Sequence, residues 1–180
     1  MRENFLHKIL NDLEGRTPGW LAVMEIQILL NITAKGFDVP GKRVIGLSRE
    51  KALRAYAEFT RDCMNMEYAE PEKLYQEAYK AGERIRRFTG FSSREDLKRL
   101  VFYLYKNIYI SMKGELPGEI TVTDCYFGHV YSAEQCELMS NVDSGIIAGI
   151  FGGGELEFTE RISEGCGRCR ACFKGGNADE

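Results

Sequence analysis

The last third of the chain, from Glu119 to Lys174, constrains the fold most tightly because strand and helix patterns follow one another there and it carries five of the six cysteines. Residues 119–127 are β-branched and aromatic, which is typical of a β-strand. Ser132 and Gln135 form a capping-box pattern that predicts a helix running toward Gly149. A glycine triplet then predicts a turn, and two further strand-like segments follow it: residues 156–162 and residues 165–173.

The first two thirds of the chain show helical periodicity instead. Apolar residues recur at helical spacing in five segments: residues 3–14, a helix capped by Thr17 with Pro18 at its first position, a helix capped by Ser48, residues 71–89, and residues 93–112. The fourth of these helices is expected to bury Phe88. Helices first and strands later is an α+β order. We therefore expect one α+β domain over residues 1–180, with an N-terminal helical layer (1–114) packed on a small C-terminal antiparallel sheet with one crossing helix (115–175).

Composition restricts the class of partner. The chain has 180 residues, of which 44% are hydrophobic and 28% are charged, and its net charge is −3. This balance is typical of a globular protein and provides no basic field for nucleic acid or an anionic membrane, so we expect neither partner. No apolar run is long enough to span a bilayer, and residues 1–5 lack the apolar core of a signal peptide. We therefore expect a cytoplasmic protein whose cysteines are thiols, ligands or catalysts rather than disulfides.

The segment from Trp20 to Leu30 is apolar around most of a helix circumference. Such a helix lies either in the core or at an interface between chains. A core position is the favoured interpretation, and a homodimer formed through this helix is the alternative.

Asp143 interrupts an apolar helix face. It shares that face of the helix after Ser132 with Cys136, Met139, Ile146 or Ile147, and Ile150. A buried carboxylate is costly unless it is paired or hydrogen-bonded. Two interpretations stay open: an acid/base or substrate-orienting group with a perturbed pKa, and a structural carboxylate paired with an arginine or a backbone donor.

Glu160 raises a similar question on the strand predicted near residues 156–162. Strict alternation would turn it to the same side as Leu156 and Phe158. A β-bulge or an edge position would turn Glu160 outward, and this is the favoured interpretation because edge strands often carry charge.

Cys166, Cys169 and Cys172 form a Cys-x-x-Cys-x-x-Cys motif. This spacing is common among metal ligands, and with Cys125 as a further donor it predicts zinc or, alternatively, an iron–sulfur cluster. A continuous strand over residues 168–174 competes with that arrangement, because it would turn Cys169 and Cys172 to opposite faces. Only the Cys166–Cys169 pair, at a turn before the strand, satisfies both constraints, and Cys125 is the candidate for a further ligand.

His129 is a candidate proton shuttle. Its even spacing from Cys125 puts both on one strand face, but about 13 Å of strand rise separates their backbones. A direct dyad is therefore disfavoured, whereas a contact with Cys136 across the fold stays open. The favoured alternative is an ordinary residue at the end of a strand.

Five short motifs in this region carry a family resemblance: Thr123-x-Cys125-x-Phe127, Cys136-x-x-x-Ser140-x-x-Asp143, Gly149, residues 158–162, and Glu164-Gly165-x-x-x-Cys169-x-x-x-Phe173. They resemble the C-terminal half of the L-2-amino-thiazoline-4-carboxylic acid hydrolase-like family over residues 119–173. A second resemblance is to the 4-vinyl reductase-type small-molecule-binding domain, which shares the helix, two strands and the Gly-x-x-x-Cys ending. The helical half matches in layout only.

The first resemblance implies a pocket between helices and sheet in which water opens a small cyclic C–N or C–S substrate. Cys125, Asp143 and Cys169 match recurrent positions, which implies Cys125 or Cys169 as the nucleophile or zinc ligand and Asp143 as the acid/base or orienting group. His129 joins them as the candidate proton shuttle. The same resemblance implies ligand-binding positions at Ser140, Phe127 and Cys136. The hydrolase-like pattern often carries cysteine at the position of Ser140, so a thiolate nucleophile there is missing. The second resemblance implies a non-catalytic sensor or carrier for a small hydrophobic ligand, sometimes with a metal.

Overall fold

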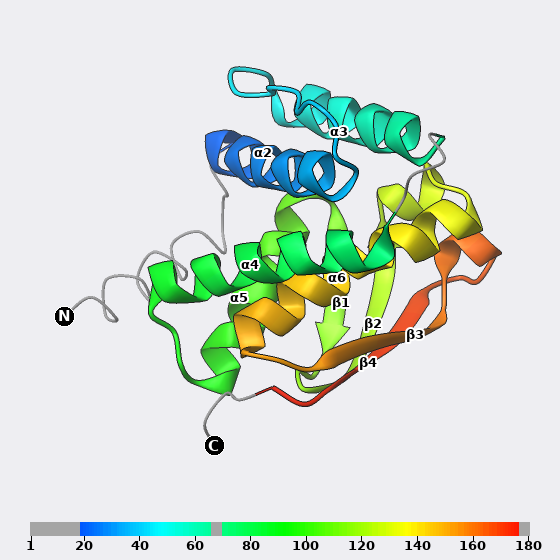
Figure 1. The fold of residues 1–180 in the computed structure, drawn as a ribbon. Helices are drawn as coiled ribbons and strands as arrows, with labels where there is room; N and C mark the ends of the chain where they lie inside the picture. The colour runs from blue at the N-terminus through cyan, green and yellow to red at the C-terminus, as the bar shows by residue number, and fades with distance from the viewer. Residues whose placement is uncertain (1–18, 66–69, 177–180) are drawn as a thin grey trace.

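The computed structural model describes residues 19–65 and 70–176, and these residues form the expected α+β domain (Figure 1). Their helices are α2 (Gly19–Gly36), α3 (Arg49–Met64), α4 (Pro71–Thr89), α5 (Arg94–Asn107) and α6 (Ala133–Phe151). Their strands are β1 (Ile110–Gly114), β2 (Gly118–Cys125), β3 (Glu155–Glu160) and β4 (Cys169–Lys174), with 3₁₀ turns at Phe127–His129 and Ile162–Glu164. The helix predicted over residues 3–14 and the cap predicted at Thr17 and Pro18 lie outside the described residues.

The four strands form one antiparallel sheet in the order β1–β2–β4–β3. The last strand therefore lies inside the sheet, where Ala171 of β4 is opposite both Ile120 of β2 and Phe158 of β3. α6 packs against this sheet, and α4 runs along the side of α6 that faces away from the sheet (Figure 1). The prediction of a small antiparallel sheet with one crossing helix is confirmed.

The sheet has one strand more than the sequence patterns indicated. The helix predicted to continue to Met112 ends at Asn107, and Tyr109 adopts a left-handed backbone conformation with φ 58°. A helix cannot continue through that conformation. The β-branched Ile110 then begins β1, where it is buried and pairs with Cys125. This part of the prediction is wrong, because the apolar residues after Asn107 fit a helix face and a strand equally well.

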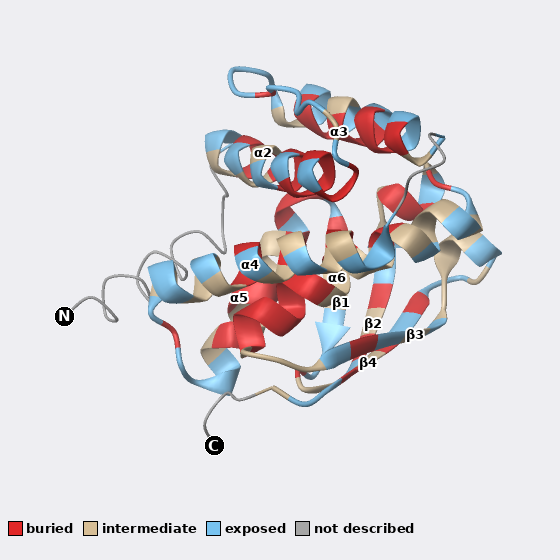
Figure 2. Cartoon of the chain, in the orientation of Figure 1, coloured by how far each residue is buried: buried red, intermediate tan, exposed pale blue. Residues whose placement is uncertain are grey.

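α6 begins and ends as its sequence predicts. The Ser132 hydroxyl accepts a hydrogen bond from the backbone N–H of Gln135, and the Gln135 side chain accepts one from the backbone N–H of Ser132. Gly152 ends the helix in the left-handed conformation, at φ 77°. Figure 2 shows the last turns of α6 buried beneath α4. The helices approach so closely that a Cβ added to Gly149 would lie 2.2 Å from the carbonyl oxygen of Tyr79.

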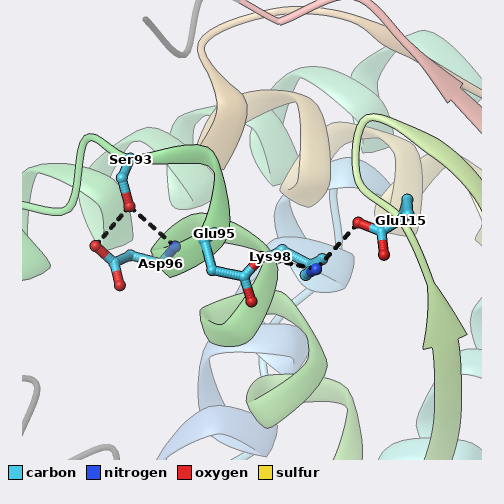
Figure 3. A network of polar contacts seen from close by, with 5 residues as sticks. All are labelled: Ser93, Glu95, Asp96, Lys98 and Glu115. Carbon is cyan, nitrogen blue, oxygen red and sulfur yellow. Dashed lines mark hydrogen bonds and ion pairs between the residues drawn. The ribbon is translucent and has the colours of Figure 1, made fainter. Parts of the chain in front are cut away.

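A polar network joins α5 to the loop between β1 and β2 (Figure 3). Ser93 caps α5 by accepting from the backbone N–H of Asp96, and its hydroxyl donates to the Asp96 carboxylate at 2.6 Å. Lys98 lies 2.7 Å from the carboxylate of Glu95 and 3.0 Å from that of Glu115. The ammonium of Lys98 therefore links the start of α5 to the hairpin loop.

α2 is a core helix on one side only. Its inner face is buried, but Trp20, Met24 and Ile28 are exposed and lie at helical spacing on the opposite face. The homodimer through this helix stays a prediction. Phe88, expected to be buried, is 85% exposed because it lies on the outer face of the last turn of α4. Among the described helices, none combines the length and apolar character needed to cross a membrane.

Candidate functional site

Two small adjoining cavities lie around the middle of α6. The inner cavity, of about 50 Å³, lies between α6 and the sheet, and its lining includes Cys125, Ser140, Asp143, Arg161 and Cys169. The second cavity, of about 60 Å³, lies toward α2 and α3 and is lined partly by aromatic side chains: Tyr56, Phe127 and Tyr131. Both cavities share the same four lining residues: Ile110, Cys125, Cys136 and Asp143. Asp143 therefore lies at the partition between them.

An open groove of about 560 Å³ adjoins the inner cavity from outside. Four residues line both spaces: Ser140 on α6, Leu156 and Phe158 on β3, and Arg161 just after β3. We call these four residues the junction. The guanidinium of Arg161 lies 4.9 Å from the centre of the Phe158 ring, a cation–π distance. The junction therefore separates the groove from the inner cavity in which Asp143 lies.

Asp143 is held by a phenol. The hydroxyl of Tyr105, on α5, donates a 2.8 Å hydrogen bond to Asp143 Oδ1. Asp143 is partly buried and lines both cavities. Burial raises the pKa of Asp143 from 3.8 to about 6, although the hydrogen bond from Tyr105 and the charge of Arg161 both act to lower it. A carboxylate with this pKa exchanges its proton near neutral pH.

The thiols around Asp143 are protonated groups. Burial raises the pKa of Cys125 to about 12, although its sulfur accepts a 3.4 Å hydrogen bond from the backbone N–H of Gly128. Burial also raises the pKa of Cys136 and of Cys169. Because the thiolate is the reactive form, these cysteines are weak nucleophiles as they stand in the fold.

The structure brings most, but not all, of the predicted site residues to the two cavities. Cys125, Asp143, Cys136, Ser140 and Cys169 all line the inner cavity. Phe127 lines the second cavity only, where it stacks on Tyr131 with ring centres 5.4 Å apart. His129 lies on the surface, where its side chain is 65% exposed and its Nε2 is 3.5 Å from Asp124. His129 lines neither cavity, which agrees with its favoured interpretation as an ordinary residue rather than with the contact to Cys136 that the sequence left open.

The predicted metal ligands do not assemble. Cys169 is buried in β4, and Cys172 is turned to the other face, as strand alternation predicts. Cys166 lies in the loop before β4. Over residues 19–65 and 70–176, no three His, Cys, Asp or Glu side chains are placed so that they could hold a metal ion. The sulfurs of Cys125, Cys166 and Cys169 as placed do not fit zinc or an iron–sulfur cluster, and we derive no chemistry from either.

Glu160 is a surface residue, as expected. The pairing of β3 with β4 shifts between Phe158 and Glu160, which marks a bulge, and β3 is an edge strand. The carboxylate of Glu160 lies 3.5 Å from Arg168 and 3.4 Å from Arg170. Glu160 therefore belongs to an exposed ion-pair cluster.

Sequence reasoning missed two residues of the site, Tyr105 and Arg161. Tyr105 was an ordinary member of an apolar helix stripe, and no local pattern shows that its hydroxyl meets a carboxylate 38 positions later. Arg161 was an outward residue of an alternating strand, and the bulge that precedes it redirects its side chain.

Glu25 is a second partly buried carboxylate, and burial raises its pKa. It accepts a hydrogen bond from Asn107 and lines neither cavity, so it does not belong to the candidate site. The signal for Glu25 was present: it is the one charged residue between Trp20 and Leu30.

Comparison of the chain with protein-family models gives no match. Comparison with curated proteins also gives no match.

Proposed function

We propose that this protein hydrolyses a small cyclic compound of the 2-aminothiazoline-4-carboxylate type, with Asp143 as the general base. The observation that supports this most strongly is the Asp143 carboxylate, which lies in a cavity wall with a pKa raised to about 6. A general base works best when its pKa lies near the operating pH. Within the described residues Asp143 accepts one hydrogen bond, at Oδ1, so Oδ2 has no protein donor and is available to a water molecule.

The hydrolytic step needs a proton acceptor that later returns the proton. Asp143 accepts a proton from water while the water oxygen bonds to the ring carbon between sulfur and nitrogen. The carbon–sulfur bond then breaks, and protonated Asp143 gives its proton to the leaving sulfur. The water oxygen becomes a carbonyl oxygen, one water hydrogen ends on the ring nitrogen and the other on the thiol. No oxidant, reductant or metal takes part in this balance.

A carboxylate base fits the site better than a cysteine nucleophile. With a pKa near 12, Cys125 would be ionised in only about one molecule in 10⁵ at pH 7. Cys169 also has a raised pKa, and its sulfur accepts a 3.3 Å hydrogen bond from the backbone N–H of Ile162. We assign both thiols to shaping the cavity, because a thiol packs as a small hydrophobe.

The size of the cavities favours a small substrate. Pockets for drug-sized ligands measure about 300–1,000 Å³, whereas the inner cavity measures about 50 Å³. A single small ring can place its reactive carbon beside Asp143 only if the rest of the molecule extends through the junction toward the groove.

The test is thiol release from L-2-aminothiazoline-4-carboxylate. Wild-type protein should release thiol into the protein-free filtrate, and Asp143→Asn should lose about 10²–10⁴-fold in rate, as expected for removal of a general base. The matched control is Asp124→Asn, because Asp124 is an exposed aspartate that lines neither cavity. Absence of turnover by the wild type, or equal rates for wild type and Asp143→Asn, would contradict the proposal.

The second candidate is a binding module without catalysis, as in the 4-vinyl reductase-type resemblance. It is favoured by the largely apolar lining of the inner cavity: Ile110, Met112, Ile120, Val122 and Ile147. Such a lining suits a small hydrophobic ligand. If this candidate is correct, uncharged ring compounds should raise the melting temperature of the wild type while thiol release is absent.

A further inference from the structure

Arg161 lies where the inner cavity meets the groove, and it is the one basic residue among the residues lining the groove. Its side chain is 15% exposed. Charged side chains are rarely buried to this extent without partners that satisfy their hydrogen bonds. The contacts of Arg161 therefore show whether other protein groups satisfy the hydrogen-bonding capacity of its guanidinium.

The hydrogen bonding of the Arg161 guanidinium is incomplete. Nη1 lies 3.6 Å from the Glu164 carboxylate, and Nη2 lies 3.5 Å from the hydroxyl of Ser140, which is the limit of a hydrogen bond. Nε is buried and has no hydrogen-bond partner among the described residues. A buried donor without a partner costs about 1–3 kcal/mol, so such donors are rare in folded proteins.

The guanidinium of Arg161 is planar and always charged, and its paired N–H groups form a fork that matches the two oxygens of a carboxylate. Nε is covered by protein, so a ligand at the junction would meet the Nη groups, whose contacts with Glu164 and Ser140 are long. The Phe158 ring lies against the guanidinium, at 4.9 Å from its centre, and restricts the direction in which the fork can point. The Ser140 hydroxyl donates to the backbone carbonyl oxygen of Cys136 at 2.8 Å and accepts from Nη2, so it helps to hold the guanidinium in place. These groups together make a preorganised site for a planar anion.

The acidic residues around Arg161 favour a singly charged anion over a doubly charged one. The groove also carries three glutamates, Glu72, Glu137 and Glu155, and Asp143 lies in the inner cavity beyond the junction. Their negative charge opposes the approach of a doubly charged group such as a phosphate monoester. A monocarboxylate needs only one positive partner and is therefore the better match.

We propose that Arg161, positioned by Ser140 and Phe158, is the carboxylate-binding residue of this site, and that the ligand is a small monocarboxylate held at the junction with its reactive end toward Asp143. This inference rests on the proposed function for the identity of the reactive end but not for the carboxylate contact. It assigns specificity to a residue that neither the motifs nor the resemblance singled out.

The first test observes Arg161 directly and needs no turnover. The side-chain Nε–H resonance of Arg161, assigned by its loss in Arg161→Lys, is followed by ¹H–¹⁵N NMR while wild-type protein is titrated with propionate or with propionamide. We expect a saturable shift with propionate and none with the neutral amide. A resonance that neither compound moves, or that both move equally, would overturn the inference.

The second test uses a matched pair of ring compounds, 2-aminothiazoline-4-carboxylate and 2-aminothiazoline, which differ by the carboxylate. At pH 8, where Asp143 is ionised, Arg161→Gln should raise KM for the carboxylate compound about 10- to 100-fold, the range expected for loss of a charge-assisted hydrogen bond. Its effect on kcat should be much smaller, and the compound without a carboxylate should not respond. The control is Arg168→Gln, because Arg168 lies in the same segment but pairs with Glu160 on the surface. An unchanged KM in Arg161→Gln would contradict the inference.

The two proposals fail separately in these tests. A propionate shift at Arg161 without thiol release from any ring compound would keep the carboxylate site and remove the hydrolase. Thiol release that is unaffected by Arg161→Gln would keep the hydrolase and remove the carboxylate site.

Discussion

Tyr105 on α5 and Asp143 on α6 meet through a 2.8 Å hydrogen bond in which the phenol donates to Asp143 Oδ1. Each group changes the proton affinity of the other. The hydrogen bond lowers the pKa of Asp143, which burial raises, while burial and the carboxylate raise the pKa of Tyr105 well above its usual value. Tyr105 therefore stays protonated and holds Oδ1 in place, while Oδ2 has no donor among the described residues.

Asp143→Asn should change the pH dependence of stability. Between about pH 4 and pH 6 the folded protein binds the Asp143 proton more tightly than the unfolded chain does, so the free energy of unfolding falls as pH rises through this window and is flat above it. A pKa raised from 3.8 to about 6 corresponds to about 3 kcal/mol lost above pH 7.

The neutral amide avoids this loss, so Asp143→Asn should be more stable than wild type at pH 8 and similar to it at pH 4. Urea unfolding at both pH values measures the difference. Glu25 also has a raised pKa and contributes a slope of the same sign to both proteins, so the difference between them isolates Asp143. Equal stability at pH 8 would contradict the raised pKa.

Tyr105→Phe should move the acidic limb of the pH–rate profile to higher pH. Loss of the phenol removes a donor that favours the ionised carboxylate, so the pKa of Asp143 rises further. The variant should also lose about 1.5–3 kcal/mol of stability at pH 8, the range for a hydrogen bond to a charged group. Tyr103→Phe is the control, because the buried Tyr103 hydroxyl has no hydrogen-bond partner among the described residues and its removal should cost little. A profile that Tyr105→Phe leaves in place would show that Asp143 does not set the acidic limb.

Cys125 should be slow to alkylate and dispensable for the chemistry. Its raised pKa and its position in the cavity wall predict that iodoacetamide labels Cys172, on the other face of the sheet from Cys169, well before Cys125. Peptide mass spectrometry over a time course gives the order. Cys125→Ser should retain most of the thiol-release activity, and a loss as large as that of Asp143→Asn would point to a nucleophilic thiol instead.

Gly149→Ala should destabilise the protein although alanine is the better helix former. The added methyl group would lie 2.2 Å from the Tyr79 carbonyl oxygen, so α4 and α6 must separate. Overpacking of this kind costs about 1–3 kcal/mol. Gly167→Ala is the matched control, since a Cβ there would meet no atom within 4 Å. Thermal unfolding should show a lower midpoint for Gly149→Ala alone.

Much of the fold could be predicted because its signals are local. The capping box at Ser132, the glycine after α6 and the alternation of Cys169 and Cys172 each depend on residues within a few positions of one another. The end of α5 at Asn107 could not be predicted. The turn there requires a left-handed backbone conformation at Tyr109, and no glycine or proline at that position indicates it in the sequence.

The candidate site was predictable only in part, for a similar reason. Asp143 was detectable because a carboxylate interrupts an apolar stripe within a single helix. Its partner Tyr105 and the junction residue Arg161 come from other elements, and only the packing of α5 and the bulge in β3 brings them to the same cavity. His129 is exposed to solvent, which agrees with its favoured interpretation as an ordinary residue at the end of a strand.

The most direct measurement of the central claim is the pKa of Asp143 itself. Titration of the Asp143 carboxyl carbon by ¹³C NMR, assigned by its loss in Asp143→Asn, should give a midpoint near pH 6. A midpoint below pH 4 would show that the carboxylate is solvated like an ordinary surface aspartate, and would contradict its role as a general base in a protected cavity.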